Sequence, residues 1–185
     1  LTGKRAILRP MERIDRLHAW ESAQVFPFSR AAAVEVGWDP TEIAARLRSG
    51  RWHRLTRGAY VLTEFWDTLD PGDQHLCVVA GRLLLLKAGW HAARGSAVIA
   101  HGLPYLGQPP GHPQLVCQPA TATANATSPH ERLAALPRQD RAVARGIRVT
   151  STARTAIDCA RSMTMREAVV VADAVLRRGV PQEEL

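Results

Sequence analysis

The chain carries a dense cluster of arginines whose chemistry is the binding of anions. A segment of twelve consecutive residues has no acidic side chain but contains five arginines and one histidine. They are Arg46, Arg48, Arg51, Arg54, Arg57 and His53. A guanidinium group presents several N–H donors in one plane, which suits phosphate oxygens. The net charge of +7 and the pI near 10.3 also favour a polyanionic partner. An anionic membrane surface fits less well, because no long basic amphipathic helix is present.

Ser96, His101 and Asp158 are the residue types from which a hydrolytic triad is built. Such a triad needs the three side chains in one specific geometry. The sequence contains neither a nucleophile elbow nor an oxyanion-hole motif. We therefore expect Ser96 to cap a short helix and His101 to end it, and the sequence predicts a protein without enzymatic activity.

The cysteines and histidines do not predict a metal site. Cys77, Cys117 and Cys159 are separated by roughly forty residues and form no C-x-x-C pair. Their odd number argues against a disulfide framework, so we expect three buried thiols. The seven histidines show no metal-ligand spacing with carboxylates or cysteines. We expect neither a metal nor another cofactor.

Sequence signals place two helices before and within the arginine cluster. Ser29 can cap a helix over 30–36, and Gly37 suits the left-handed position that ends it. Asp39 and Glu42 have the spacing of a capping box at the start of a second helix, with Pro40 in the first helical position. This second helix is expected to end at Gly50.

Two short strands follow the second helix and make a hairpin around the turn at Arg57-Gly58. Apolar and aromatic residues mark these strands: Trp52, Leu55, Tyr60 and Leu62. Aromatic rings in a basic hairpin can stack on bases, but here we expect Trp52 and Tyr60 to anchor the hairpin in a core. Residues 11–23 form an expected amphipathic helix, with Ile14, Leu17 and Trp20 on one face.

The order helix, turn, helix, hairpin is typical of a winged helix-turn-helix, which we expect over residues 1–66. In such domains the second helix lies in the major groove and presents its N-terminal side chains to base edges. The side chains expected at base edges are Trp38, Asp39, Thr41, Glu42 and Ala45. The full set of predicted DNA-binding residues is Arg30, Trp38, Thr41, Arg46, Arg48, Arg51, His53, Arg54 and Arg57.

Two alternatives concern this basic region. A basic helix can be a solvated face that binds nothing, in which case the domain is a protein-interaction module. The N-terminal arm with Lys4, Arg5 and Arg9 can enter a minor groove or remain a solvated tail. One domain with roughly six phosphate contacts binds DNA weakly at physiological salt, so we expect dimerisation on repeated half-sites.

A second domain is expected over residues 67–185, after a linker over 64–72. Its first element is a long apolar helix over 72–88, which Asp70 and Pro71 open. We expect a turn over 90–95, a short helix from Ser96 to His101-Gly102, a strand over 114–118 and a mobile loop over 119–129. Further strands are predicted over 132–136, 141–143 and 147–150.

Two helices complete this second domain, so the expected fold class is α+β. Ser151 or Thr152 caps the first, which ends near Arg161, and Arg154 and Asp158 have the spacing of an ion pair within it. Thr164 and Glu167 form a capping box for the second, which runs to about residue 178.

Three blocks of the sequence resemble the AbiEi-type antitoxins of type IV toxin–antitoxin systems and the regulators related to them. These blocks are SGRWHRLTRGAYVL, GSAVIAHGLP, and RVTSTARTAIDCAR followed by a helix that ends in VLRRG. The resemblance implies an N-terminal winged helix joined to a mixed α/β antitoxin domain. It also implies binding to repeats in the protein's own promoter, repression of the operon, and neutralisation of a cognate nucleotidyltransferase-like toxin.

The segment over 113–149 departs from that family, because it is shorter and less strand-like. Some relatives continue after the VLRRG helix into an endonuclease-like domain. The alternative function is therefore the N-terminal region of an endonuclease-like protein whose catalytic domain lies beyond Leu185. The sequence has no apolar run of transmembrane length and no signal-peptide core at its start, so we expect a cytoplasmic protein without membrane contact.

Overall fold

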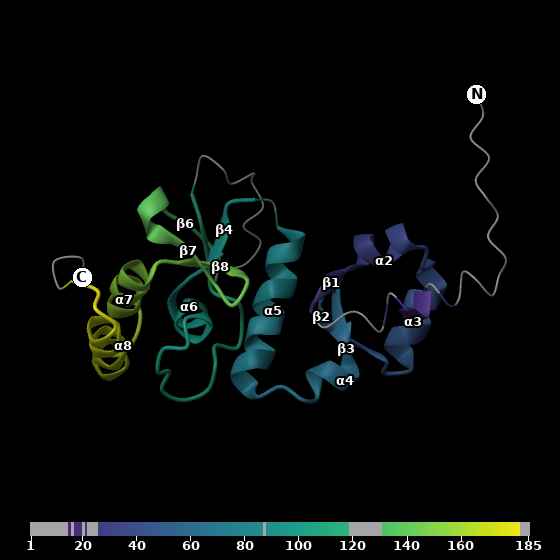
Figure 1. Cartoon of the computed structure of the whole chain (residues 1–185), viewed down its shortest axis with the longest axis horizontal. Helices are drawn as coiled ribbons and strands as arrows, with labels where there is room; N and C mark the ends of the chain where they lie inside the picture. The colour runs from purple at the N-terminus through teal and green to yellow at the C-terminus, as the bar shows by residue number, and fades with distance from the viewer. Residues whose placement is uncertain are drawn as a thin grey trace, which may run out of the picture. The chain divides into compact units, whose positions relative to one another are not determined.

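The computed structural model describes residues 15, 17–19, 21, 26–86, 88–118 and 131–181 (Figure 1). These residues form helices and two separate sheets, as the α+β class requires. The chain divides into two compact units, Leu1–Thr68 and Leu69–Leu185, while the sequence places the boundary between residues 66 and 67. No helix in the described ranges combines the length and the apolar character that a bilayer crossing needs.

The two predicted helices of the first unit are present with their predicted caps. In α2 (Arg30–Val36) the Ser29 hydroxyl accepts a hydrogen bond from the N–H of Ala32, and Gly37 ends the helix at φ 116°. In α3 (Pro40–Arg48) the Asp39 carboxylate accepts from the first-turn N–H groups, and Glu42 completes the capping box. Local signals determine both helix starts, because the capping groups lie within three residues of each other.

The strands of the first unit form a sheet in the order β1-β3-β2. Strands β2 (Trp52–Thr56) and β3 (Ala59–Leu62) make the predicted hairpin, and β1 (Phe28–Ser29) pairs antiparallel with β3. The hairpin is followed by α4 (Thr63–Trp66), a helical turn at a position where the sequence predicts a linker.

An aromatic core holds the first unit together. Phe28 and Trp38 each contact the Trp52 ring edge to face, with centroids 4.8 and 5.4 Å apart, and Tyr60 packs beside it. The prediction that Trp52 and Tyr60 belong to the core is confirmed, since both are buried. Of the predicted helix over 11–23, residues 15, 17–19 and 21 are helical and Leu17 is buried. The remainder of that helix and the N-terminal arm lie outside the described residues.

The second unit contains a five-stranded mixed sheet in the order β6-β5-β4-β8-β7. Its strands are β4 (Trp90–Ala92), β5 (Leu115–Cys117), β6 (Glu131–Leu133), β7 (Arg141–Ala144) and β8 (Ile147–Thr150). β4 pairs parallel with β8 and antiparallel with β5. The turn predicted over 90–95 is therefore wrong, because residues 90–92 form the central strand. This strand is short and buried throughout, so it lacks the alternation that reveals a strand in sequence.

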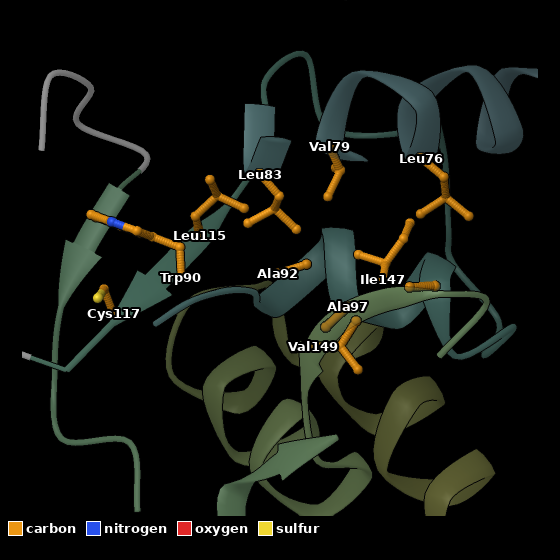
Figure 2. Close-up of a cluster of buried hydrophobic side chains, with 11 residues drawn as sticks. Leu76, Val79, Leu83, Trp90, Ala92, Ala97, Leu115, Cys117, Ile147 and Val149 are labelled. Atoms are coloured by element: carbon orange, nitrogen blue, oxygen red, sulfur yellow. The ribbon is translucent and has the colours of Figure 1, made fainter. Parts of the chain in front are cut away.

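Helices cover this sheet and fill the core of the second unit. They are α5 (Pro71–Leu85), α6 (Arg94–Ala100), α7 (Thr152–Ala160) and α8 (Met165–Arg177), with a 3-10 turn over Arg138–Asp140. Figure 2 shows Leu76, Val79 and Leu83 reaching from α5 toward Ala92 and Ile147 of the sheet. A second buried cluster joins α6 to α7 and α8. The capping box predicted at Thr164 and Glu167 is confirmed.

Three further predictions for the second unit need correction or fall outside the structure. Ser96 does not cap α6, because the helix begins at Arg94 and the cap position is Ala93. α5 ends at Leu85, one turn earlier than predicted. The loop predicted over 119–129 lies outside the described residues.

Candidate nucleic-acid interface

The first unit exposes a group of arginines around α3 and the hairpin. These exposed residues are Arg30, Arg48, Arg51, Arg54 and Arg57. In the described part of the chain, none of their guanidinium groups makes an ion pair or a side-chain hydrogen bond. Guanidinium groups that no described residue pairs are available to an external anion.

The fold brings three of these arginines around one groove. The groove has a volume of about 730 Å³ and lies between α3 and the hairpin. Arg30, Arg48 and Arg54 line it, together with the apolar side chains of Ile43 and Leu47. Arg30 reaches it because its N–H donates to the carbonyl of Gly58 over 2.8 Å, which holds the start of α2 against the hairpin turn.

The outward face of α3 is short and combines a polar, an apolar and a basic side chain. Thr41, Ala45 and Arg48 are exposed and follow each other at helical spacing. At the start of the helix, one Asp39 oxygen accepts from the Thr41 hydroxyl over 2.6 Å and from the Thr41 N–H over 2.7 Å. The polar side chains predicted to contact base edges, Asp39, Thr41 and Glu42, therefore take part in the cap of α3. Ala45 takes no part in that cap.

Trp38 does not belong to the candidate interface, although the sequence places it among the base-contacting residues. Its side chain is only 4% exposed and packs on Trp52. Trp38 precedes the capping residue Asp39, and Ile43 follows the first helical turn in the same buried cluster. These are the positions of a hydrophobic staple, which is the sequence signal that could have predicted the burial.

Arg46 is also removed from the set of predicted phosphate contacts. Its guanidinium lies 4.8 Å above the Trp38 ring and 3.3 Å from a carboxylate oxygen of Glu21. The same Glu21 carboxylate accepts from the indole N–H of Trp52 over 2.7 Å. Arg46 is therefore a structural residue, and sequence reasoning missed Glu21 because it is distant along the chain.

His53 is positioned on the hairpin but is a poor cation. Its ring stacks on Trp66 with centroids 4.2 Å apart and an interplanar angle of 11°. Burial lowers the pKa of His53 below 6.5, although Asp67 opposes this effect. We therefore expect a neutral imidazole at pH 7, which can donate one hydrogen bond but adds no charge.

Ser96, His101 and Asp158, the side chains considered for a triad, each make a different structural contact. Ser96 is fully buried, and its hydroxyl is 2.8 Å from Nε2 of His75, a partner that the sequence did not reveal. His101 Nε2 is 2.8 Å from the Thr150 carbonyl. Asp158 accepts from Arg154 in the predicted ion pair, at 3.0 Å. These contacts tie helices and strands together and assemble no triad.

The cysteines are buried, as predicted, and carry no disulfide. Burial raises the pKa of Cys77 to about 11 and that of Cys159 to about 12, so both are thiols at neutral pH. Among the described residues, no group of histidine, cysteine and acidic side chains is arranged to hold a metal ion.

No protein-family model matches the chain, and no curated protein matches it either. What the first unit offers a partner therefore follows from its own side chains. Its exposed arginines come from α2, α3 and the hairpin, while the paired Arg46 and the neutral His53 add no free charge. This arrangement suits a ligand with several phosphates spaced along a surface.

Proposed function

We propose that the first unit is a winged helix-turn-helix that binds double-stranded DNA. The observation that carries the proposal is the group of exposed arginines on α2, α3 and the hairpin, none of which is paired within the described residues. Phosphate contacts of this kind supply affinity and fix the register on the duplex, but they carry no sequence information. Sequence would be read from the exposed face of α3 at Thr41 and Ala45.

The order of elements supports the same proposal. A short strand, two helices and a hairpin whose strands pair in the order β1-β3-β2 agree with a winged helix. In this arrangement α3 would enter the major groove, and the hairpin would follow the adjacent backbone. Arg48 at the end of α3 and Arg57 at the hairpin turn would then face phosphates.

We further propose a cytoplasmic, non-enzymatic transcriptional regulator, and within that class a type IV antitoxin that represses its own operon. The resemblance of three sequence blocks to AbiEi-type antitoxins supports this step. In the second unit, GSAVIAHGLP contains all of α6 except Arg94, and RVTSTARTAIDCAR contains most of β8 and all of α7. The partners would be promoter repeats and a nucleotidyltransferase-like toxin.

Fluorescence anisotropy on the protein's own upstream DNA and on scrambled DNA, over a salt series, tests the proposal. We expect tight binding to the upstream DNA and not to the scrambled DNA. Such discrimination requires that the protein reads the base sequence. If each exposed arginine neutralises one phosphate, log K should fall against log salt with a slope of about −4.5 per domain. Equal, weak binding to both DNAs would reduce the arginines to a nonspecific electrostatic surface and contradict the proposed regulator.

A further inference from the structure

Helix α8 carries a second apolar stripe that the described residues of the second unit leave exposed. Its buried stripe is Ala168, Val171 and Val175, of which Val171 and Val175 pack in one cluster with α6 and α7. Beside it lies an exposed stripe in which Met165 is 80%, Val169 56% and Leu176 40% exposed, with the half-buried Ala172 between them. We call Met165, Val169, Ala172 and Leu176 the outer stripe. In Figure 1, α8 lies at one edge of the second unit.

The spacing of the outer stripe is that of a helix-pairing seam. Its members follow each other at intervals of four, three and four residues, which is the alternation of a and d positions in a heptad. The stripe spans about three turns, or roughly 16 Å. A seam with this repeat buries its side chains best against a second helix.

Charges beside the outer stripe indicate what that second helix is. Arg166 and Asp173 are exposed and occupy equivalent positions along the free border of the stripe. If two copies of α8 lie antiparallel, with Met165 over Leu176 of the other copy, Arg166 of each copy comes opposite Asp173 of the other. A parallel pair brings no such opposite charges together. Asp173 also pairs with Arg177 of its own helix at 3.0 Å, but that pair is exposed and weak.

We propose that the outer stripe of α8 is a self-association surface that joins two copies of this chain through an antiparallel helix pair. The seam is apolar at its centre and carries two equivalent Arg166–Asp173 pairs at its border. Because a pair of helices of this length buries little area, we expect a dissociation constant on the order of tens of micromolar. The proposal is independent of DNA binding and is tested without DNA.

Sedimentation equilibrium of the full chain over a concentration series is the first test. We expect a monomer–dimer equilibrium that Val169→Glu abolishes, since it puts a carboxylate in the seam. Val143→Glu is the matched control, because Val143 is also an exposed valine, 70% accessible, but lies on β7. Circular dichroism checks that each variant is folded. A wild type that stays monomeric, or a dimer that only V143E disrupts, would overturn the proposal.

Charge exchange and crosslinking test the register. R166E or D173R alone should weaken association by about tenfold, because each turns two attractions into repulsions. The double variant R166E/D173R should restore it. Under oxidation, a mixture of Met165→Cys and Leu176→Cys chains should crosslink, while neither variant alone should crosslink with itself. Self-crosslinking of M165C would indicate a parallel pair and overturn the antiparallel arrangement.

Discussion

The indole nitrogen of Trp52 donates a hydrogen bond to a carboxylate oxygen of Glu21 over 2.7 Å, and both side chains are buried. The second oxygen of the same carboxylate lies 3.3 Å from the Arg46 guanidinium. Glu21 therefore connects the hairpin to α3. Among the arginines predicted to bind DNA, Arg46 is the one that the structure pairs with a described acid.

Glu21→Gln separates these two interactions. The amide oxygen can still accept from Trp52, but the charge that balances Arg46 is lost. We expect the first unit to lose roughly 1.5–3 kcal/mol of unfolding free energy, the range for hydrogen bonds to charged groups. Urea unfolding followed by tryptophan fluorescence measures the loss. Unchanged stability would mean that Arg46 and Glu21 do not depend on each other.

Replacing Arg48, Arg51 and Arg54 with alanine should weaken binding to all DNA sequences. Each lost phosphate contact lowers the salt slope by about 0.9, so the triple variant should lose between two and three units of slope. The matched control replaces Arg138, Arg148 and Arg161, which carry the same charge in the second unit. Anisotropy titrations over salt measure both variants. Equal losses in the two variants would assign the effect to net charge and not to this surface.

The cap residues show which features of this surface the sequence predicts. The capping side chains lie within three residues of the groups that they bind, so the local sequence determines their geometry. They are Ser29, Asp39 and Glu42. The sequence pattern misplaces Trp38 at the interface because an aromatic residue before a helix can face either a groove or a core. Only the staple position relative to Ile43 distinguishes these cases.

Distant partners could not be predicted in the same way. β4 is short and uniformly buried, and it becomes a strand because β5 and β8 pair with it from elsewhere in the chain. Ser96 is a residue type that often caps helices, but here its hydroxyl is hydrogen-bonded to His75 and to the N–H of Gln114. The Gln114 N–H donates to this hydroxyl over 2.9 Å. Each depends on tertiary contacts that no local pattern encodes.

Stability should fall as the solution becomes acidic below about pH 6.5. Burial is the main cause that lowers the pKa of His75, His91 and His101 from 6.5. Nearby arginines lower the values of the last two further, while backbone hydrogen bonds oppose the shifts in all three. Below 6.5 the unfolded chain binds more protons than the folded one, and this favours unfolding.

Urea unfolding between about pH 7.5 and about pH 5.5 measures this effect. His101→Gln should reduce the slope, because the glutamine amide can donate to the Thr150 carbonyl without titrating. A slope that is identical in this variant would show that His101 does not contribute.

Gly95→Ala should destabilise the second unit, although alanine usually stabilises a helix. A Cβ at Gly95 would lie 2.8 Å from Cγ of Pro110 and 3.0 Å from the Tyr105 ring. We expect a cost of about 1–3 kcal/mol from this overpacking. Gly111→Ala is the control, since nothing lies within 4 Å of its Cβ position. Thermal melts that rank the two variants equally would contradict the close approach.

The thiols should resist modification in the folded protein. All three cysteines are buried, and burial raises the pKa of Cys77 and Cys159 well above neutrality. At neutral pH a thiol reagent should label none of them quickly, and all of them in denaturant. Val143→Cys supplies an exposed thiol as the positive control. Rapid labelling of the native wild type would show that the second unit opens readily.

The parallel pairing of β4 with β8 has a consequence for biosynthesis. Ala92 of the central strand meets Val149, a residue that leaves the ribosome much later. Until then, Leu76 and Val79 on α5 lack the Ile147 and Val149 side chains that complete their cluster. In the first unit, one tight turn joins the two strands of the hairpin. In the second unit, the apolar side chains of α5 stay exposed until β8 has been synthesised. This interval is when the chain is most open to aggregation and to capture by chaperones.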